Sequence, residues 1–203
     1  TALQWSPADS AQYHPVGYAI FRKIGEPGTW QELYRGPMPD SAYYGSFTAR
    51  AKENFSLSGI LVHMELIRSV ALIKRCAAKA NLGLGKLDKR IADAIIKAAD
   101  DVIDGKLDKE FVLDAFQAGA GTPLHMNVNE VIANRAEELL GGRVGEYKLV
   151  HPNNHVNMSQ SSNDVVPAAA RLAAIRLHSK IQEEASMIVK SLEKKAREHK
   201  GTL

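Results

Sequence analysis

The pattern of apolar and polar positions divides the chain into an irregular N-terminal stretch and a helical remainder. From residue 58 onward, apolar side chains recur at spacings of three and four, the period of an amphipathic helix. With its glycine and proline punctuation, this pattern predicts helices over 64–82, 88–104, 127–140 and 167–200. Residues 1–55 lack that period and are expected to form loops with short strands, of which 16–21 is the best candidate.

The first predicted helix, over residues 64–82, carries its apolar side chains on one face. They are Leu66, Ile67, Val70, Ile73, Ala77 and Ala80. The basic side chains, Lys74 among them, fall off this apolar face. Cys76 is expected on the inner face as a core residue. As the only cysteine of the chain, it excludes an internal disulfide and suits a reducing, cytoplasmic compartment.

The last predicted helix, over residues 167–200, has an apolar seam that repeats nearly as a heptad. Its members are Ala170, Ala174, Leu177, Ile181, Ala185, Ile188 and Leu192. A pattern of about 35 residues is roughly 50 Å long at 1.5 Å per residue, and no other segment can cover it. We therefore expect partner helices from a C-terminal part beyond this chain or from other subunits; the alternative is a helix that frays. The chain starts at Thr1 rather than Met, so we expect a piece of a longer protein.

Composition changes along the chain, while charge is nearly balanced. Ten of the aromatic residues (2 Trp, 6 Tyr and 5 Phe in all) lie before residue 56, which indicates a change of architecture near that point. A net charge of +3 argues against a nucleic-acid interface or a polybasic membrane surface. No apolar run approaches the roughly 18–20 residues of a membrane span. The 203 residues suit one domain or slightly more.

Two polar segments, each leading toward a predicted helix, are candidate binding loops. The first, residues 119–127, reads GAGTPLHMN. Its glycines allow the backbone to approach a ligand, and the free N–H groups at a helix start favour an anion. The alternative is a plain glycine turn in which Thr122 or Asn127 caps the helix.

The second segment, residues 151–164, reads HPNNHVNMSQSSND, with hydrogen-bonding side chains at 11 of its 14 positions. Its Ser-Ser-Asn sequence at 161–163 offers neutral donors that can hold carboxylate oxygens. The alternative is an N-cap formed by Asn163 or Asp164. His151 and His155 have the i,i+4 spacing of metal ligands, but Pro152 disfavours a helix there and no cysteine or acidic cluster accompanies them, so no metal site is expected.

These two segments resemble the first two signature regions of the fumarase/aspartase superfamily. The first match extends over residues 119–134, which read GAGTPLHMNVNEVIAN. The N-terminal segment of that family is matched by YYG at 43–45, TARA at 48–51 and ENF at 53–55. The resemblance runs from about residue 39 to the end of the chain and leaves 1–38 as an unassigned extension.

The resemblance implies a mainly α fold of the L-aspartase type. After an irregular N-terminal segment, it implies a mostly helical lyase domain over 39–157 and the start of a central helix bundle over 158–203. It further implies a homotetramer whose active sites are each built from three chains. Members remove a proton next to a carboxylate, pass through an aci-carboxylate dianion and expel ammonia, another amine or water. The implied ligand is a small dicarboxylate, with no cofactor, nucleic-acid or membrane partner.

The resemblance also assigns roles to single positions. One substrate carboxylate is bound at positions matched by Ala120, Gly121 and Thr122. The other end of the substrate is held at positions matched by Ser161, Ser162 and Asn163. A secondary anion site near the entrance is matched by His151, Pro152, Asn153 and Asn154. The family's serine-bearing loop, GSSxMPxKxNP, does not occur in the sequence, so no catalytic base is identified and this chain alone is expected to be inactive.

The same matches bear on whether the leaving group is ammonia or water. Ala120, the YYG of 43–45 and Arg50-Ala51 favour an ammonia-lyase that acts on L-aspartate. Ser162 and His151 favour the hydration chemistry of fumarate and malate. The balance favours ammonia, with the hydratase as the alternative and a non-catalytic structural or binding fragment of the same fold as a third hypothesis.

Overall fold

The computed structural model describes residues 17–24, 29–37, 42–119 and 121–201, and it is mainly helical, as predicted. A hairpin of β1 (Gly17–Ile24) and β2 (Thr29–Pro37) precedes the helices. The helices are α1 (Ser46–Asn54), α2 (Met64–Gly83), α3 (Lys89–Ile103), α4 (Thr122–Leu139) and α5 (Ser162–Glu198). Two short helical turns, Asp108–Glu110 and Pro152–Val156, lie before and after α4.

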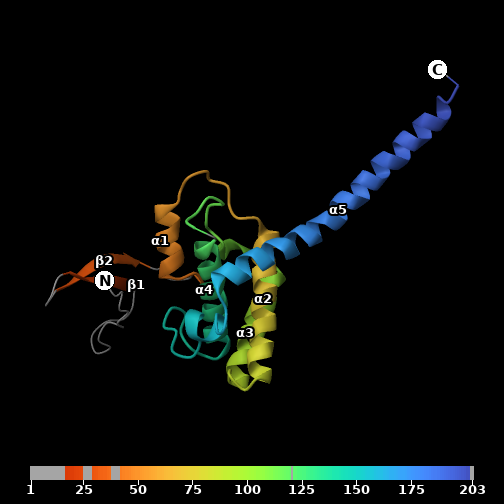
Figure 1. Cartoon of the computed structure of the whole chain (residues 1–203). Helices are drawn as coiled ribbons and strands as arrows, with labels where there is room; N and C mark the ends of the chain where they lie inside the picture. Colours follow the sequence, from red (N-terminus) through yellow and green to blue (C-terminus); the bar gives the residue numbers. More distant parts are fainter. Residues whose placement is uncertain (1–16, 25–28, 38–41, 120, 202–203) are drawn as a thin grey trace.

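The core lies where α2, α3 and α4 meet, and the first part of α5 packs across α2 (Figure 1). The buried side chains are mostly small or β-branched, for example Val70, Ile95, Val128 and Ile132. Small side chains let helices approach closely and interdigitate. This core fixes the direction in which α4 and α5 begin, which positions the candidate site.

The N-terminal part departs from the predicted loops in two places. The strand predicted over 16–21 is confirmed from Gly17 and runs on to Ile24, whereas Val16 lies outside the described residues. The second strand and α1 were not predicted, and the assignment of loops to residues 46–54 is wrong. Tertiary contacts explain this helix: the backbone N–H groups of Gly45, Phe47 and Thr48 donate to the buried Glu130 carboxylate of α4, which stabilises the start of α1.

The buried face of α2 corrects two predictions from the sequence. It includes Ile67, Val70, Lys74 and Ala78, which follow one another at spacings of three and four. Lys74 lies on the buried face rather than off it, and Cys76 is exposed rather than part of the core. Residues two apart on a helix are rotated by about 200°, so a face that includes Lys74 turns Cys76 outward.

Helices α4 and α5 each begin five residues earlier than predicted, at Thr122 instead of 127 and at Ser162 instead of 167. Pro123 occupies the first turn of α4, where its missing N–H costs nothing. Pro167 lies one turn into α5 and cannot donate to the carbonyl of Asn163. Pro167 is therefore a poor marker of where α5 begins, because Ser161, and not the proline, caps the start of the helix.

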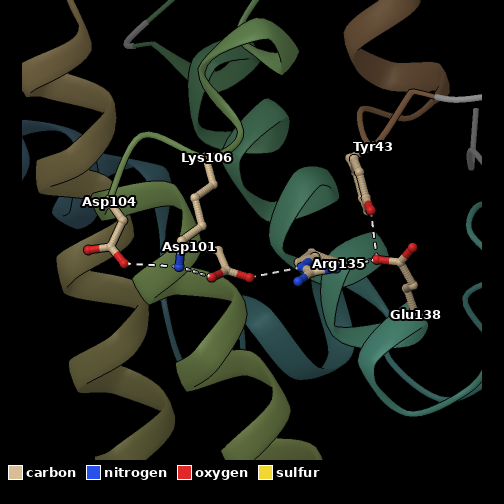
Figure 2. A network of polar contacts seen from close by, with 6 residues as sticks. All are labelled: Tyr43, Asp101, Asp104, Lys106, Arg135 and Glu138. Atoms are coloured by element: carbon tan, nitrogen blue, oxygen red, sulfur yellow. Dashed lines mark hydrogen bonds and ion pairs between the residues drawn. The ribbon is translucent and has the colours of Figure 1, made fainter.

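A chain of polar contacts connects α3, α4 and the N-terminal segment (Figure 2). Arg135 on α4 donates to the Asp101 carboxylate on α3 at 2.9 Å and also pairs with Glu138. Tyr43 donates its hydroxyl to Glu138 at 2.6 Å. Lys106 forms ion pairs with both Asp101 and Asp104, which adds Asp104 to the network. This network holds the segment before α1 against α4 and is remote from the candidate site.

Beyond its contacts with α2 and α4, α5 continues alone and projects away from the other helices (Figure 1). The apolar side chains of its seam stay exposed there: Ile181 is 65%, Ile188 61% and Leu192 64% accessible. Nothing within the described residues covers them, as the length of the seam predicted. None of the helices in the described ranges is both long and apolar enough to cross a membrane.

Candidate active site

The segment between α4 and α5 runs back along α4 and brings the two helix starts together. The backbone N–H groups of Leu149 and Val150 donate to the buried Glu137 carboxylate near the end of α4. Thirteen residues after Leu149, Ser162 contacts His125 near the start of α4, with 2.7 Å between Oγ and Nδ1. The donor-bearing loops of the sequence therefore lie side by side in one chain.

The start of α4 is formed by a glycine turn rather than by a capping serine or threonine. Gly121 is the residue before the helix and has a left-handed backbone, with φ of 77°. Neither Thr122 nor Asn127 caps the helix, so that alternative is wrong; instead, Oε1 of Gln117 accepts from the backbone N–H of Leu124 in the first turn at 2.6 Å. The Thr122 side chain is exposed, whereas Asn127 is buried and donates to the Glu110 carbonyl. Ala120 lies outside the described residues.

Gly121 also sets how closely the two starts approach. A Cβ atom placed on Gly121 would lie 2.9 Å from Cγ1 of Val166 on α5. Atoms this close repel strongly, so a larger residue would push the first turn of α5 away. Glycine here is required both by the left-handed backbone and by the proximity of α5.

The start of α5 is capped by Ser161, whose Oγ accepts from the Asn163 N–H at 3.3 Å. The alternative in which Asn163 or Asp164 caps this helix is therefore wrong. The Asn163 side chain is exposed and makes no hydrogen bond within the described part of the chain. Ser162 is half-buried and turns its hydroxyl toward His125.

The buried Lys74 contacts His125, which in turn contacts Ser162. The sequence patterns did not indicate Lys74 as a site residue. Lys74 places its Nζ 2.5 Å from Nε2 of His125, 2.8 Å from Oδ1 of Asn157 and 3.0 Å from Oε1 of Gln160. Burial lowers the pKa of Lys74 to about 7, and burial together with the Lys74 charge lowers the pKa of His125 to about 3. The signal was present in the sequence: Lys74 continues the apolar spacing of Ile67 and Val70.

The residues matched to a secondary anion site form a separate turn. His151 caps the π-helical turn Pro152–Val156, its Nδ1 accepting from the backbone of Asn153 at 3.1 Å and of Asn154 at 3.3 Å. The expectation that Pro152 prevents a helix here is wrong, because proline suits the first position of the turn. Burial lowers the pKa of both His151 and His155. No hydrogen bond within the described ranges joins this turn to Thr122 or to 161–163.

The arrangement places several hydrogen-bond donors at two helix starts, with the exposed carboxylate of Asp164 in the first turn of α5. The two helix starts carry partial positive charge and approach each other, Gly121 beside Val166 and His125 beside Ser162. Thr122, Ser161, Ser162 and Asn163 place hydroxyl and amide side chains at these starts, and the buried Lys74 contacts His125, the partner of Ser162. Hydroxyl and amide donors at helix starts are chemically suited to the oxygens of a small anion. A surface hollow lined by Asp88, Lys97 and Leu140 lies at the other end of α4 and is not part of this site.

Comparison with known proteins agrees with this geometry. A family model described as Lyase matches residues 35–203. The aspartate ammonia-lyase of Bacillus sp is 47% identical over 166 residues, covering 82% of this chain and 36% of that relative. The class II fumarate hydratase of Halobacterium salinarum is 51% identical over 138 residues, covering 68% of this chain and 29% of that relative.

A solved structure shares the fold as well. The fumarate lyase:delta crystallin of Brucella melitensis in native form superposes with a TM-score of 0.78 and 48% identity, covering 82% of this chain and 38% of that chain. The fold and these matches thus define a protein of the fumarate-lyase class. Within that class, the chain belongs to the fumarase/aspartase superfamily. It spans only about a third of the length of the relatives it matches.

Proposed function

We propose that this chain is the N-terminal part of an aspartate ammonia-lyase, which eliminates ammonia from L-aspartate to give fumarate through an aci-carboxylate intermediate. The observation that carries the proposal is the proximity of the starts of α4 and α5, with Ser162 Oγ 2.7 Å from His125 Nδ1. In this proposal, Ala120, Gly121 and Thr122 bind one carboxylate of the substrate. Ser161, Ser162 and Asn163 hold its other end.

The donors act on the charge that develops during proton removal. When the carbon next to a carboxylate loses its proton, negative charge moves onto the carboxylate oxygens. Preorganised N–H and O–H donors at a helix start stabilise that charge more than they stabilise the ground state. Removing one such donor from an anion-stabilising site costs about 2.7–4 kcal/mol in the transition state. The chain thus contributes binding and charge stabilisation, and proton removal is assigned to the serine loop that the resemblance implies.

Fumarate hydratase is the second candidate, because the relatives include both activities. The Bacillus sp protein eliminates ammonia by its name, and the Halobacterium salinarum protein is a class II fumarate hydratase at a slightly higher identity over a shorter stretch. Ser162 and His151 favour the hydratase, whereas Ala120, the YYG of 43–45 and Arg50-Ala51 favour the ammonia-lyase. Both candidates use the same carboxylate-binding residues.

We extend the proposal to the assembly. The exposed seam of α5 supports a homotetramer with a shared central bundle, in which residues 39–157 form the peripheral domain and 158–203 begin the bundle. His151, Pro152, Asn153 and Asn154 are proposed to bind a second anion on their own turn. The exposure of Asn153 and Asn154 leaves their amides accessible for this role.

The experiment is a turnover assay on the full-length protein that contains this chain. Fumarate formation is followed by absorbance with L-aspartate and, separately, with L-malate. Turnover of aspartate supports the ammonia-lyase, and turnover of malate alone supports the hydratase. Turnover of neither would contradict both and favour a non-catalytic role.

A further inference from the structure

The contacts around Lys74 fix the direction of a chain of hydrogen bonds. The Gln160 amide donates through Nε2 to the carbonyls of Val156 and Met158, at 3.0 and 3.1 Å, so its Oε1 faces Lys74. Asn157 likewise turns its Oδ1 to Lys74 at 2.8 Å. Two N–H bonds of Lys74 are thereby committed to oxygens that only accept.

The third position on Lys74 Nζ faces Nε2 of His125, and the protonation of the lysine decides which atom donates. An ammonium group has no lone pair, so charged Lys74 donates to Nε2. The neutral imidazole then carries its proton on Nδ1, which donates to Ser162 Oγ at 2.7 Å. The Ser162 hydroxyl hydrogen is then free to be donated to another acceptor.

We propose that Lys74 and His125 are positioning residues that turn the Ser162 hydroxyl outward as a donor to a carboxylate bound at the start of α5. The proposal rests on the proposed function of Ser162 and adds a pH-dependent control of it. When Lys74 loses its proton, its lone pair accepts from Nε2 and the imidazole proton moves there. Nδ1 then accepts the Ser162 hydroxyl hydrogen, and the donor to the carboxylate is lost.

No other charged group within the described ranges lies within hydrogen-bond or ion-pair distance of Lys74. On α3, Asp100 pairs with Arg75 and Asp101 with Arg135 and Lys106. On α2 itself, Glu65 pairs with Arg176, and Asp164 of α5 is exposed. His125 is therefore the titratable partner of Lys74, and its lowered pKa keeps it neutral above pH 6. The lowered pKa of Lys74, about 7, puts the change of direction in the neutral range.

The direction itself is tested by NMR on the 203-residue chain with ¹⁵N-labelled histidine rings. The His125 signal is assigned by its absence in H125N. We expect the proton on Nδ1 at pH 6 and on Nε2 at pH 9. The same tautomer at both values, or a charged imidazole at pH 6, would overturn the proposal. This measurement needs no substrate.

The consequence is tested by succinate affinity in the full-length protein at pH 6 and pH 9. Loss of one hydrogen bond to a charged acceptor predicts binding about tenfold weaker at pH 9. In K74M this pH dependence should disappear. The control K79M removes an exposed lysine of the same helix and should keep the dependence. If Ser162 transmits the effect, K74M combined with S162A should bind no more weakly than S162A alone.

The outcomes separate the two proposals. Succinate binding of equal strength at both pH values overturns the relay and leaves the proposed function intact. Absence of both succinate binding and turnover contradicts the proposed function, while the tautomer of His125 still decides the direction of the hydrogen bonds. The wild-type measurements carry these decisions even if K74M does not fold.

Discussion

Asn163 lies at the second position of α5 with an exposed amide that has no partner within the described residues. A side chain with no structural contact is free to face a ligand. We predict that N163A lowers kcat/KM of the full-length protein by about 100-fold or more, because an anion-stabilising donor is lost. Its free energy of unfolding, measured by urea titration, should change by less than about 0.5 kcal/mol. Loss of stability with retained activity per folded molecule would contradict this role.

Gly45 is packed so closely that a methyl group does not fit. A Cβ atom there would lie 2.5 Å from both Oε1 of Glu130 and the Tyr147 hydroxyl. We predict that G45A destabilises the protein by about 2–3 kcal/mol, through displacement of the carboxylate that holds the start of α1. G83A is the matched control, because a Cβ atom at Gly83 meets nothing within 4 Å. Equal urea midpoints for the two variants would refute the packing argument.

The buried Lys74 predicts how stability varies with pH. Its pKa falls from 10.5 in the unfolded chain to about 7 in the folded protein. Between these values the unfolded chain binds a proton that the folded protein lacks, so the free energy of unfolding rises with pH. We expect a lysine contribution of up to about 1.4 kcal/mol per pH unit between pH 8 and 9.5. Urea unfolding of wild type and K74M across this range should show the larger slope in wild type; parallel slopes would contradict it.

Single residues also show where sequence reasoning stops. The resemblance predicts a binding role for Thr122 and the serines of 161–162, because a signature is local in sequence. It could not place Lys74, because the residues that surround the Nζ atom come from α4 and from 157–160. Nor does a sequence reveal that Ser161, rather than Asn163, caps α5, since either side chain suits the position.

At the scale of elements, α5 carries the strongest prediction. Its exposed seam has no cover in the described chain, and each buried isoleucine contributes about 1.5–3 kcal/mol to an interface. We predict that I188E shifts the full-length protein from an oligomer to smaller species in light scattering. Q182E, an exposed position off the seam, is the control and should leave the assembly unchanged. An unchanged mass for I188E would contradict the shared bundle.

Helix periods were predictable, whereas helix starts and isolated short elements were not. The apolar spacing located α2 and α3 within one or two residues, because their buried faces dominate the pattern. It missed α1, whose stability comes from the Glu130 carboxylate supplied by a distant helix. It started α4 late, because the first turn follows a glycine, contains Pro123 and has only Leu124 as an apolar core residue.

At the scale of the whole molecule, the packed helices α2, α3 and α4 form a frame that fixes the positions of the starts of α4 and α5. Buried carboxylates on α4 hold the segments around it, Glu130 at the start of α1 and Glu137 at the segment that leads to α5. This frame turns segments that are 40 residues apart in sequence into one donor surface. The mainly helical fold followed from periodicity, but the meeting of the two loops in one chain depends on this frame.

The central claim is that these two helix starts hold opposite ends of one small dicarboxylate. A crystal structure of the full-length protein with bound succinate tests it most directly. We predict one carboxylate within hydrogen-bond distance of Thr122 and the other within reach of Ser162 and Asn163. Succinate bound elsewhere, with water filling the region between α4 and α5, would contradict the account.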